Sequence, residues 1–481
     1  MVYYGYTKIK ERVMIETIVN SVNDALYSYI LIILLVLGGL YFSFRTKFAQ
    51  FRLFGEQIRA VTEKPKDGKG VSSFQALMVS TASRVGTGNI VGVATALCLG
   101  GVGSMFWMWI IAIIGSASAF VESTLAQIYK KKGPDGCYGG PAYYIETALR
   151  CRPLAIIFSV CLIFTYGIGF NMLASYNLQS TFSGYGFYEK FPSVMPWIIG
   201  LILAVLVGVC LFGGGKRIVS ATTAIVPFMG VAYILIALVI TIINAPALPG
   251  IIKGIFANAF DMEAIFGGFS GSCLMYGIKR GLFSNEAGVG SAPNASASAE
   301  VAHPAKQGLV QVLSVFIDTI LICSATGFMC LASGVTPTAE MAGADYVQAA
   351  LRETLGGFGP IFITVAMVLF AFTTLLGNLF YVDKAFRHIL GKTPGKLFHA
   401  VYYIVASGVI LLGAGLSSDL LWGIADIGMG AMALINMPVI FFLSKYAIRA
   451  LNHFTAQRKA GKEPSFRAAD IDLPHEVDCW K

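Results

Sequence analysis

Apolar residues run along this chain in eleven stretches, separated by shorter polar segments. A helix needs about 20 mostly apolar residues to cross the hydrocarbon core of a bilayer, and each stretch approaches or exceeds that length. The stretches lie near 25–44, 72–99, 104–129, 154–182, 196–213, 218–243, 262–283, 308–332, 358–383, 397–416 and 419–444. The pattern predicts an all-α polytopic membrane protein with eleven transmembrane helices.

Basic residues divide unevenly between the loops on the two sides of these spans. One side holds 28 of the 35 Lys and Arg residues, the other holds six, and Arg84 lies inside a span. In membrane proteins Lys and Arg concentrate in cytoplasmic loops. We therefore expect the N-terminus outside, the C-terminus in the cytoplasm, and the chain in the plasma membrane, which is the inner membrane of a bacterium.

The last ten spans divide into two sets of five. Because five is odd, the two sets would enter the membrane from opposite sides, as inverted repeats do. We expect an N-terminal segment with one extra helix and a basic cytoplasmic loop at 1–70, followed by a first repeat at 71–245. A second, inverted repeat would occupy 260–445, and a cytoplasmic tail 446–481.

The composition of the chain indicates which kinds of partner the protein has. Hydrophobic residues make up 56% of the chain and charged residues 13%, about half the charged share of soluble domains. A net charge of +9 would suggest nucleic acid in a soluble protein, but here the loops account for it. We expect a lipid bilayer and a small substrate as partners and no nucleic acid. The sequence is consistent with a monomer and leaves the oligomeric state open.

Each set of five begins with a span that glycine interrupts. The first interruption contains Gly86, Thr87, Gly88 and Asn89, and the second lies at 266–272. Glycine weakens a helix by about 0.5–1 kcal/mol relative to alanine, and unwound backbone at membrane depth needs a protein interior or a water-filled cavity. There free N–H groups can hold a carboxylate, and free C=O groups can hold a sodium ion. Glycines also allow close helix packing, but their matching places in the two sets favour a binding site.

Two adjacent hydroxyls lie in the middle of the span at 358–383. Thr373 and Thr374 can bond back to carbonyl groups of their own helix, as such residues usually do. They can also complete an oxygen cage for a monovalent cation together with carbonyls of the first interrupted helix. The chemistry of the two residues leaves both interpretations open.

Charged residues inside the membrane are costly and mark functional candidates. Arg84 lies in the first interruption, where it would form either a structural salt bridge or a cytoplasmic gate with Glu122 or Glu286. Asp318 lies near the middle of its span and would belong either to an ion path or to a structural network. Other acidic residues lie nearer span ends and are expected to be solvated or paired: Glu146, Asp383 and Asp426.

The sequence contains no motif of a membrane-embedded enzyme. It has no HExxH, the glycines at 268–272 do not complete a GxSxG, and 213–216 lacks the remaining residues of a P-loop. Nine cysteines form no CxxC pair, and five histidines show no metal-ligand spacing. A channel would need filter loops repeated around a ring of subunits. Since the sequence has no nucleotide-binding motif, a protein of this kind that moves a substrate across the membrane would take its energy from an ion gradient. We expect no organic cofactor.

Several motifs resemble the alanine/glycine:cation symporter family, and together they extend from about residue 70 to 385. The matching segments are VGTGNI at 85–90 with GVA at 92–94, GGVG at 100–103, FWMW at 106–109, GGPAYYIE at 139–146, GIKRGLFSNEAG at 277–288 with GSAP at 290–293, VFIDT at 315–319 and AFTT at 371–374. The resemblance implies the sodium-coupled leucine-transporter type of fold with an added N-terminal helix. It also implies symport of a small neutral amino acid, such as alanine or glycine, with Na⁺ or H⁺ by alternating access.

The resemblance also implies roles for residues of the interrupted helices. The first group would bind substrate, with the amides of Thr87 and Gly88 on its carboxylate, and comprises Gly86, Thr87, Gly88 and Asn89. The second group would receive the amino group and side chain: Gly267, Gly268, Phe269, Ser270, Gly271 and Ser272. The sodium ion would be held by the carbonyls of Ala82, Val85 and Phe370 and the hydroxyls of Thr373 and Thr374. Asn378 stands where parts of the family have an aromatic residue, so a larger or more polar substrate such as glutamine or serine stays an alternative.

Overall fold

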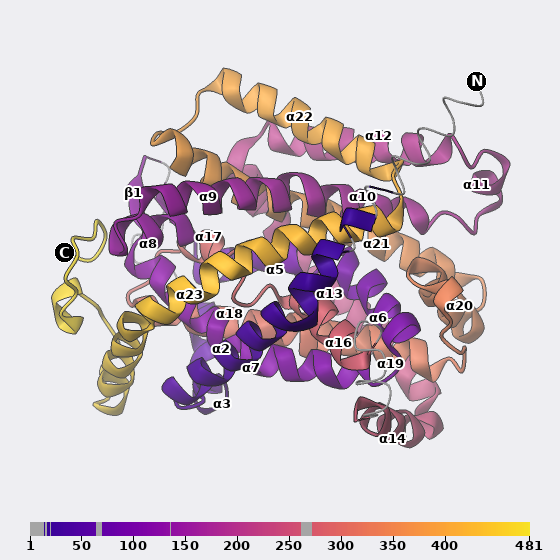
Figure 1. The fold of residues 1–481 in the computed structure, drawn as a ribbon, viewed down its shortest axis with the longest axis horizontal. Coiled ribbons are helices and arrows are strands. Elements are labelled where there is room, and N and C mark those ends of the chain that lie inside the picture. The colour runs from indigo at the N-terminus through magenta and orange to yellow at the C-terminus, as the bar shows by residue number, and fades with distance from the viewer. Residues whose placement is uncertain (1–13, 15–16, 20, 64–69, 135, 261–271) are drawn as a thin grey trace.

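A computed structural model describes residues 14, 17–19, 21–63, 70–134, 136–260 and 272–481. Within these ranges the chain is almost entirely helical (Figure 1). The strands found there are β1 (Lys131–Gly133) and β2 (Gly136–Tyr138), which pair antiparallel as a short hairpin. The fold is therefore a helical bundle.

Seven helical stretches of the described chain are long and apolar enough to span a membrane. Four of them are the single helices α7 (Ser104–Ile128), α13 (Gly214–Ile243), α21 (Phe358–Leu390) and α22 (Lys396–Ala414). A fifth is α23 (Ser418–Lys459). Two are compound: α9 (Arg152–Leu162), η3 (Ile163–Gly169) and α10 (Phe170–Ser180) form one, and α18 (Pro304–Val315), η6 (Phe316–Cys323) and α19 (Ser324–Ala332) the other. All seven coincide with stretches predicted from the apolar pattern.

Further apolar helices are shorter. They are η1 (Leu26–Ile30) with α2 (Leu31–Arg45), η2 (Gly88–Gly92) with α6 (Val93–Gly100), and α12 (Met195–Leu211). Two short helices of mixed polarity, α5 (Ser73–Arg84) and α16 (Cys273–Asn285), accompany them. Four compound stretches contain π-helix, at η1, η2, η3 and η6. Because π-helix is rare and is frequently found at functional sites, these segments are candidates for a site.

Short elements gather at the two ends of the bundle (Figure 1). At one end, on the left of the view, lie α3, the β hairpin, α8 and the C-terminus, and at the other lie α11, α14 and α20. Their bounds are α3 (Ala49–Arg52), α4 (Phe54–Thr62), α8 (Pro141–Ala148), α11 (Gly186–Lys190), η4 (Ala245–Ala247), α14 (Leu248–Ala259), α17 (Pro293–Ser296), η7 (Ala339–Met341), α20 (Ala344–Leu355) and η8 (Ala468–Ile471). Short elements of the described chain therefore lie at both ends of the bundle (Figure 1).

Burial separates inner helices from peripheral ones. The most apolar window of α7 is 72% buried and that of α21 is 67% buried, whereas those of α13 and α22 are each 28% buried. Large apolar side chains of the outer helices are exposed, among them Leu201, Phe228 and Ile404. Exposed apolar surface of this kind faces lipid in a membrane protein. The inner helices therefore build the site, and the outer helices shield it from lipid.

Candidate functional site

The helix that begins at Ser73 breaks near the centre of the molecule. Its start is fixed by a capping box, in which Ser72 accepts from the Gln75 amide and the Gln75 side chain accepts from the Ser72 amide. It ends at Arg84, because Val85 leaves helical geometry at φ −75° and ψ 85°, and helix resumes at Gly88 as η2. The interruption that the glycines predict is present, and it spans about three residues.

The side chain of Asn89 holds this break open. Its Oδ1 accepts the Gly86 amide at 2.9 Å. That amide would otherwise continue α5 by bonding the Ala82 carbonyl four residues earlier. Asn89 Nδ2 in turn donates to Asp318 Oδ1 at 2.7 Å and to Ser284 Oγ at 3.1 Å. One side chain therefore diverts a helix donor and anchors the break to two other helices.

Asp318 is the centre of a closed hydrogen-bond network. Besides Asn89, it receives the hydroxyls of Ser284 and of Thr319, the latter at 2.8 Å. All four side chains are buried, with Asp318 and Asn89 fully so. The carboxylate thus has donors on both oxygens, which is what a buried charge needs in order to be stable.

A small cavity lies on the other side of the break. Its walls come from the break itself, α10, the end of α16 and α21, and the lining residues are Ser83, Arg84, Gly86, Thr87, Gly88, Phe170, Leu173, Ala174, Phe283, Glu286 and Thr374. The aromatic wall is tight, because the ring centroids of Phe170 and Phe283 are 4.6 Å apart. The cavity therefore combines apolar walls with backbone and charged groups at one edge.

The glycines of the break are required by what they face. A Cβ on Gly86 would overlap Thr374 Oγ1, and a Cβ on Gly88 would lie 2.5 Å from Phe283 Cε1. Any larger residue would thus have to displace the cavity walls. The glycines bring backbone into direct contact with the cavity, as a backbone binding site needs.

Charge in the cavity comes from Arg84 and Glu286. Arg84 is 2% exposed and donates one bond, from Nη1 to Gln311 Oε1 at 2.9 Å. Its Nε and Nη2 are buried without a hydrogen-bond partner among the described residues. Arg84 attracts Glu286 and also Glu122 and Asp318 across the interior. A buried guanidinium with unused donors beside a cavity is suited to binding an anionic group.

The two adjacent hydroxyls of α21 differ. Thr373 Oγ1 donates to the Leu369 carbonyl at 2.9 Å and to the Phe370 carbonyl at 3.2 Å, so it bonds back to its own helix. Thr374 Oγ1 is buried without a hydrogen-bond partner within the described ranges and faces the break at Gly86. Only the second hydroxyl therefore directs an uncommitted oxygen toward the cavity.

Comparison with known proteins identifies the family. The model of the sodium:alanine symporter family matches residues 12–468. The chain belongs to this symporter family. Among its relatives, the amino-acid carrier protein AlsT of Bacillus subtilis is 43% identical, covering 97% of this chain and 98% of that protein. The probable sodium/glutamine symporter GlnT of the same organism is 42% identical over 97% and 96% of the two chains. The sodium/alanine symporter AgcS of Methanococcus maripaludis is 36% identical over 92% and 98%.

Solved structures agree on the fold. The crystal structure of MhsT in complex with L-phenylalanine matches with a TM-score of 0.54 and 14% identity, over 85% of this chain and 92% of that one. Its fold is of the leucine-transporter type, and at this identity the match concerns the fold alone. Membership of a transporter family makes the chain a multi-pass membrane carrier and not an enzyme.

The symporter fold brings some of the predicted gate residues to the cavity. Arg84 and Glu286 both line it. Glu122 lies outside the lining, where its Oε2 accepts Asn436 Nδ2 at 2.8 Å, and Tyr144 donates to the same Asn436. Asp318 lies behind the break.

Asn378 also lies behind the cavity wall. Its Oδ1 accepts Ser83 Oγ at 2.6 Å, and its Nδ2 donates to Asn171 Oδ1 at 3.0 Å, so both ends of the amide are engaged. The neighbouring Gly377 packs tightly on α5, since a Cβ there would lie 2.7 Å from the Ser83 nitrogen. The structure places Asn378 in a link between α5, α10 and α21.

The second predicted interruption falls mostly outside the described residues, which leave out Gly267, Gly268, Phe269, Ser270 and Gly271. Ser272 is described as the N-cap of α16, where its Oγ accepts the Met275 amide at 3.2 Å. Phe283, at the other end of that helix, lines the cavity, about 16 Å away at 1.5 Å per residue. The structure does not bring Ser272 to the cavity.

A second irregular segment follows α16 directly. Glu286 adopts φ 51°, Gly288 φ 84° and Gly290 φ 91°, before the short helix α17 begins. The segment repeats the Gly-x-Gly spacing of Gly86 and Gly88, and this spacing was the signal in the sequence that could have located it.

Other wall residues carry no such signal. Phe170, Leu173 and Ala174 stand in an apolar run, and Phe283 in a mixed segment, where a cavity-facing side chain looks like a core side chain. Asn177 is a partial exception as a polar residue in a span, and its Nδ2 donates to Thr87 Oγ1 at 3.1 Å. The predicted cation ligands Ala82, Val85 and Phe370 are all fully buried near the contact of α5 with α21.

Proposed function

We propose that this protein is a sodium-coupled symporter that carries a small neutral amino acid into the cell by alternating access. The observation that supports this most is the cavity at the break of α5, where glycine backbone, the spare donors of Arg84 and the carboxylate of Glu286 meet. An amino acid is a zwitterion, and this cavity offers both of the charges that it needs.

The carboxylate of the substrate would bind at the start of the resumed helix. The amides of Thr87 and Gly88 begin a helical segment that runs to Gly100, so the positive end of its dipole is directed at the cavity. Arg84 lies at the same edge with two nitrogens unpartnered among the described residues. Glu286 would receive the ammonium group, and Asn89 would position the amides by holding the break.

The coupling ion would lie between the break and α21. The Gly86 amide is bonded to Asn89, which supports an uncommitted carbonyl on Ala82, and Thr374 Oγ1 has no other partner within the described ranges. Carbonyls of Val85 and Phe370 and the hydroxyl of Thr373 would complete a set of oxygens, the ligand type that hard cations prefer. A hydroxyl that donates to a carbonyl still has lone pairs for a cation.

The walls favour a small neutral side chain. Phe170, Leu173, Ala174 and Phe283 are apolar, and the polar ends of Asn378 are engaged by Ser83 and Asn171. Alanine or glycine fits these surroundings. Glutamine or serine is the alternative, because one relative is named a probable sodium/glutamine symporter, and either would need a polar partner such as Thr87 or Asn177 at its side chain.

The topology that goes with this function has eleven spans. One N-terminal helix would precede two inverted sets of five, with the basic end of the molecule in the cytoplasm. Support comes from the placement of α3, the β hairpin, α8 and the C-terminus at one end of the bundle (Figure 1).

Uptake into proteoliposomes tests the proposal. Purified protein is reconstituted, and uptake of radiolabelled alanine is measured with an inward Na⁺ gradient, with K⁺ in its place, and with an inward H⁺ gradient. We expect accumulation with Na⁺ that a Na⁺ ionophore abolishes. Accumulation driven by an H⁺ gradient alone would show that H⁺ is the coupling ion. Uptake that responds to neither gradient would overturn symport. Competition by unlabelled glycine, serine and glutamine then ranks the substrates.

A further inference from the structure

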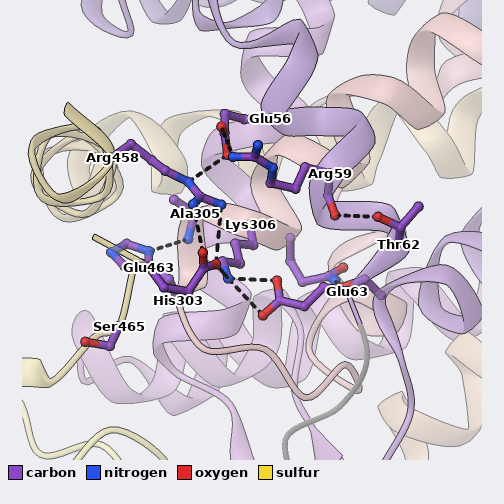
Figure 2. Close-up of polar contacts among 12 residues, drawn as sticks. Glu56, Arg59, Thr62, Glu63, His303, Ala305, Lys306, Arg458, Glu463 and Ser465 are labelled. Carbon is purple, nitrogen blue, oxygen red and sulfur yellow. Dashed lines mark hydrogen bonds and ion pairs between the residues drawn. The ribbon is translucent and has the colours of Figure 1, made fainter. Parts of the chain in front are cut away.

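The chain after α23 folds back onto the end of the molecule that carries α3 and the β hairpin. Figure 2 shows the first attachment, where Lys306 Nζ contacts Glu63 at 2.8 Å and Glu463 at 3.2 Å. Arg458 contacts Glu463 at 2.8 Å and Glu56 at 2.9 Å. Lys306 is 2% exposed, so this is a buried cation held by two carboxylates. The cluster fixes the start of the tail between α4 and α18.

The last residues of the chain form a second attachment. Trp480 Nε1 donates to the Gln127 carbonyl at 2.7 Å, and Lys130 Nζ lies 4.9 Å from the centre of the indole ring. Lys131 pairs with Asp478 at 3.2 Å. The tail is therefore docked where α7 ends and the β hairpin begins, although the two segments are more than 300 residues apart in the sequence.

Two thiols meet at this second attachment. Cys137 on β2 and Cys479 in the tail have their sulfur atoms 4.0 Å apart, and both side chains are partly exposed. A disulfide needs the sulfur atoms about 2.05 Å apart, so they must approach by about 2 Å to form one. Among the described residues no group of three or more metal-ligating side chains surrounds them, which argues against a metal site.

The groups around the pair make the Cys137 thiol easier to ionise than the Cys479 thiol. A hydrogen bond from Cys479 and the positive charges of Lys130 and Lys132 lower the pKa of Cys137, although burial and the charge of Glu300 oppose the shift. The thiolate is the reactive form of cysteine. Cys137 is therefore suited to be the attacking sulfur, with Cys479 as the resolving thiol.

We propose that Cys137 and Cys479 form a peroxide-sensitive modification site, whose disulfide fastens the C-terminal tail to the β hairpin. In the proposed orientation this end faces the cytoplasm, where thiols are normally reduced and a disulfide signals oxidation. Formation of this disulfide does not require transport by the protein.

The chemistry balances with hydrogen peroxide as the oxidant. The Cys137 thiolate attacks one oxygen, the O–O bond breaks, and the departing hydroxide takes a proton to become water. Cys479 then attacks the sulfenic sulfur, the S–S bond forms, and the hydroxyl leaves as a second water. The two thiols lose two electrons and the peroxide gains them. A dithiol reductant restores both thiols by exchange.

The other seven cysteines provide internal controls. Cys210, Cys273, Cys323 and Cys330 are buried, whereas Cys98, Cys151 and Cys161 are partly exposed. No thiol–thiol contact is found for these seven among the described residues. They should react with peroxide much more slowly than Cys137, or stop at the sulfenic acid.

The test oxidises the purified full-length protein with increasing hydrogen peroxide. Free thiols are counted by maleimide gel shift, and the disulfide is located by peptide mass spectrometry without reduction. We expect two thiols to be lost first, at least tenfold faster than the rest, with a Cys137–Cys479 peptide that dithiothreitol removes. The melting temperature of the oxidised protein should rise by several degrees, because the cross-link closes a long loop.

Variants define the controls. Cys137→Ser and Cys479→Ser should each abolish the cross-link and the rise in melting temperature, while Cys98→Ser should retain both. Equal reactivity of all exposed cysteines, a disulfide between two molecules, or oxidation of Cys137 without loss of the Cys479 thiol would each overturn the proposal. The mass spectrum of the wild-type protein decides the matter even where a variant folds poorly.

Discussion

The two sides of the break in α5 differ in how their polar groups are partnered. Behind the break, Asp318 receives hydrogen bonds from Asn89, Ser284 and Thr319. In front of it, Arg84 leaves two nitrogens and Thr374 its hydroxyl without partners among the described residues. Buried polar groups are almost always hydrogen-bonded, so an exception needs an explanation. The closed network stabilises the fold, and under the proposed function a bound ligand would complete the open set.

The largest expected effect on transport is at Arg84. Arg84→Gln should reduce sodium-driven uptake roughly 10- to 100-fold, since hydrogen bonds to charged groups contribute about 1.5–3 kcal/mol. The measurement is initial uptake by proteoliposomes that contain equal amounts of folded protein. Arg59→Gln, at a side chain that is 63% exposed, is the matched control and should transport normally. Normal uptake by Arg84→Gln would show that the open set is not the substrate site.

Substitutions of Asp318 test whether the closed hydrogen-bond network stabilises the protein. Asp318→Ala removes the acceptor of three buried donors, and we expect a loss of stability of about 3 kcal/mol or more at roughly 1 kcal/mol for each bond. Asp318→Asn keeps the shape and one acceptor and should lose less. The measurement is thermal unfolding in detergent, together with the sodium dependence of binding. If Asp318→Asn lost sodium or proton coupling at unchanged stability, the network would belong to the ion path.

Thr374 and Thr373 allow an unpartnered hydroxyl and a partnered one to be compared within the same helix. Thr374→Val should raise the half-saturating Na⁺ concentration about 3- to 10-fold, as expected for the loss of one uncharged hydrogen-bonding group. Thr373→Val should change it less, because that hydroxyl is already bonded to its own helix. Sodium titrations of substrate binding measure both. Equal, unchanged sodium dependence in the two variants would remove α21 from the cation site.

Away from the break, the comparison extends to His303, a buried and partnered group at the N-cap of α18. Its Nδ1 accepts the Ala305 amide and must be unprotonated, and its Nε2 lies 3.3 Å from His453. Burial, with repulsion from His453 and Lys306, lowers the pKa of His303 to about 3 from its ordinary 6.5. Between these values the unfolded chain binds a proton that the folded protein does not, so stability falls as the pH drops below about 6.5.

Thermal unfolding between pH 7 and pH 5 checks this prediction. At 1.36 kcal/mol per pH unit, His303 should cost the folded protein about 2 kcal/mol over that interval. His303→Asn keeps an acceptor for the helix start, since Asn is a good N-cap, and should reduce the loss at low pH. An equally steep loss in the variant would assign the acid sensitivity to other groups.

The sequence predicts seven of the spans and the first break, because both depend on local patterns. Long apolar stretches must cross the membrane as helices, and Gly86 and Gly88 weaken the helix at the point where it ends. The sequence cannot decide between Thr373 and Thr374, since two adjacent hydroxyls differ only in the direction that the packed helix gives them. Phe170 and Phe283 are equally hidden, because an aromatic residue of the wall and one of the core look alike. The motif from Glu286 to Gly290 is recognised in the sequence but its irregular backbone is not predicted, although its Gly-x-Gly spacing matches that of the first break.

A structure determined with Na⁺ and the amino acid that best stabilises the protein tests the central claim most directly. The account predicts that the carboxylate of the ligand lies against the amides of Thr87 and Gly88 near Arg84, with its side chain against the aromatic wall that Phe170 and Phe283 form. It also predicts a sodium ion within bonding distance of Thr374 Oγ1. An amino acid bound elsewhere in the bundle, with the cavity at the break still closed by protein side chains, would contradict it.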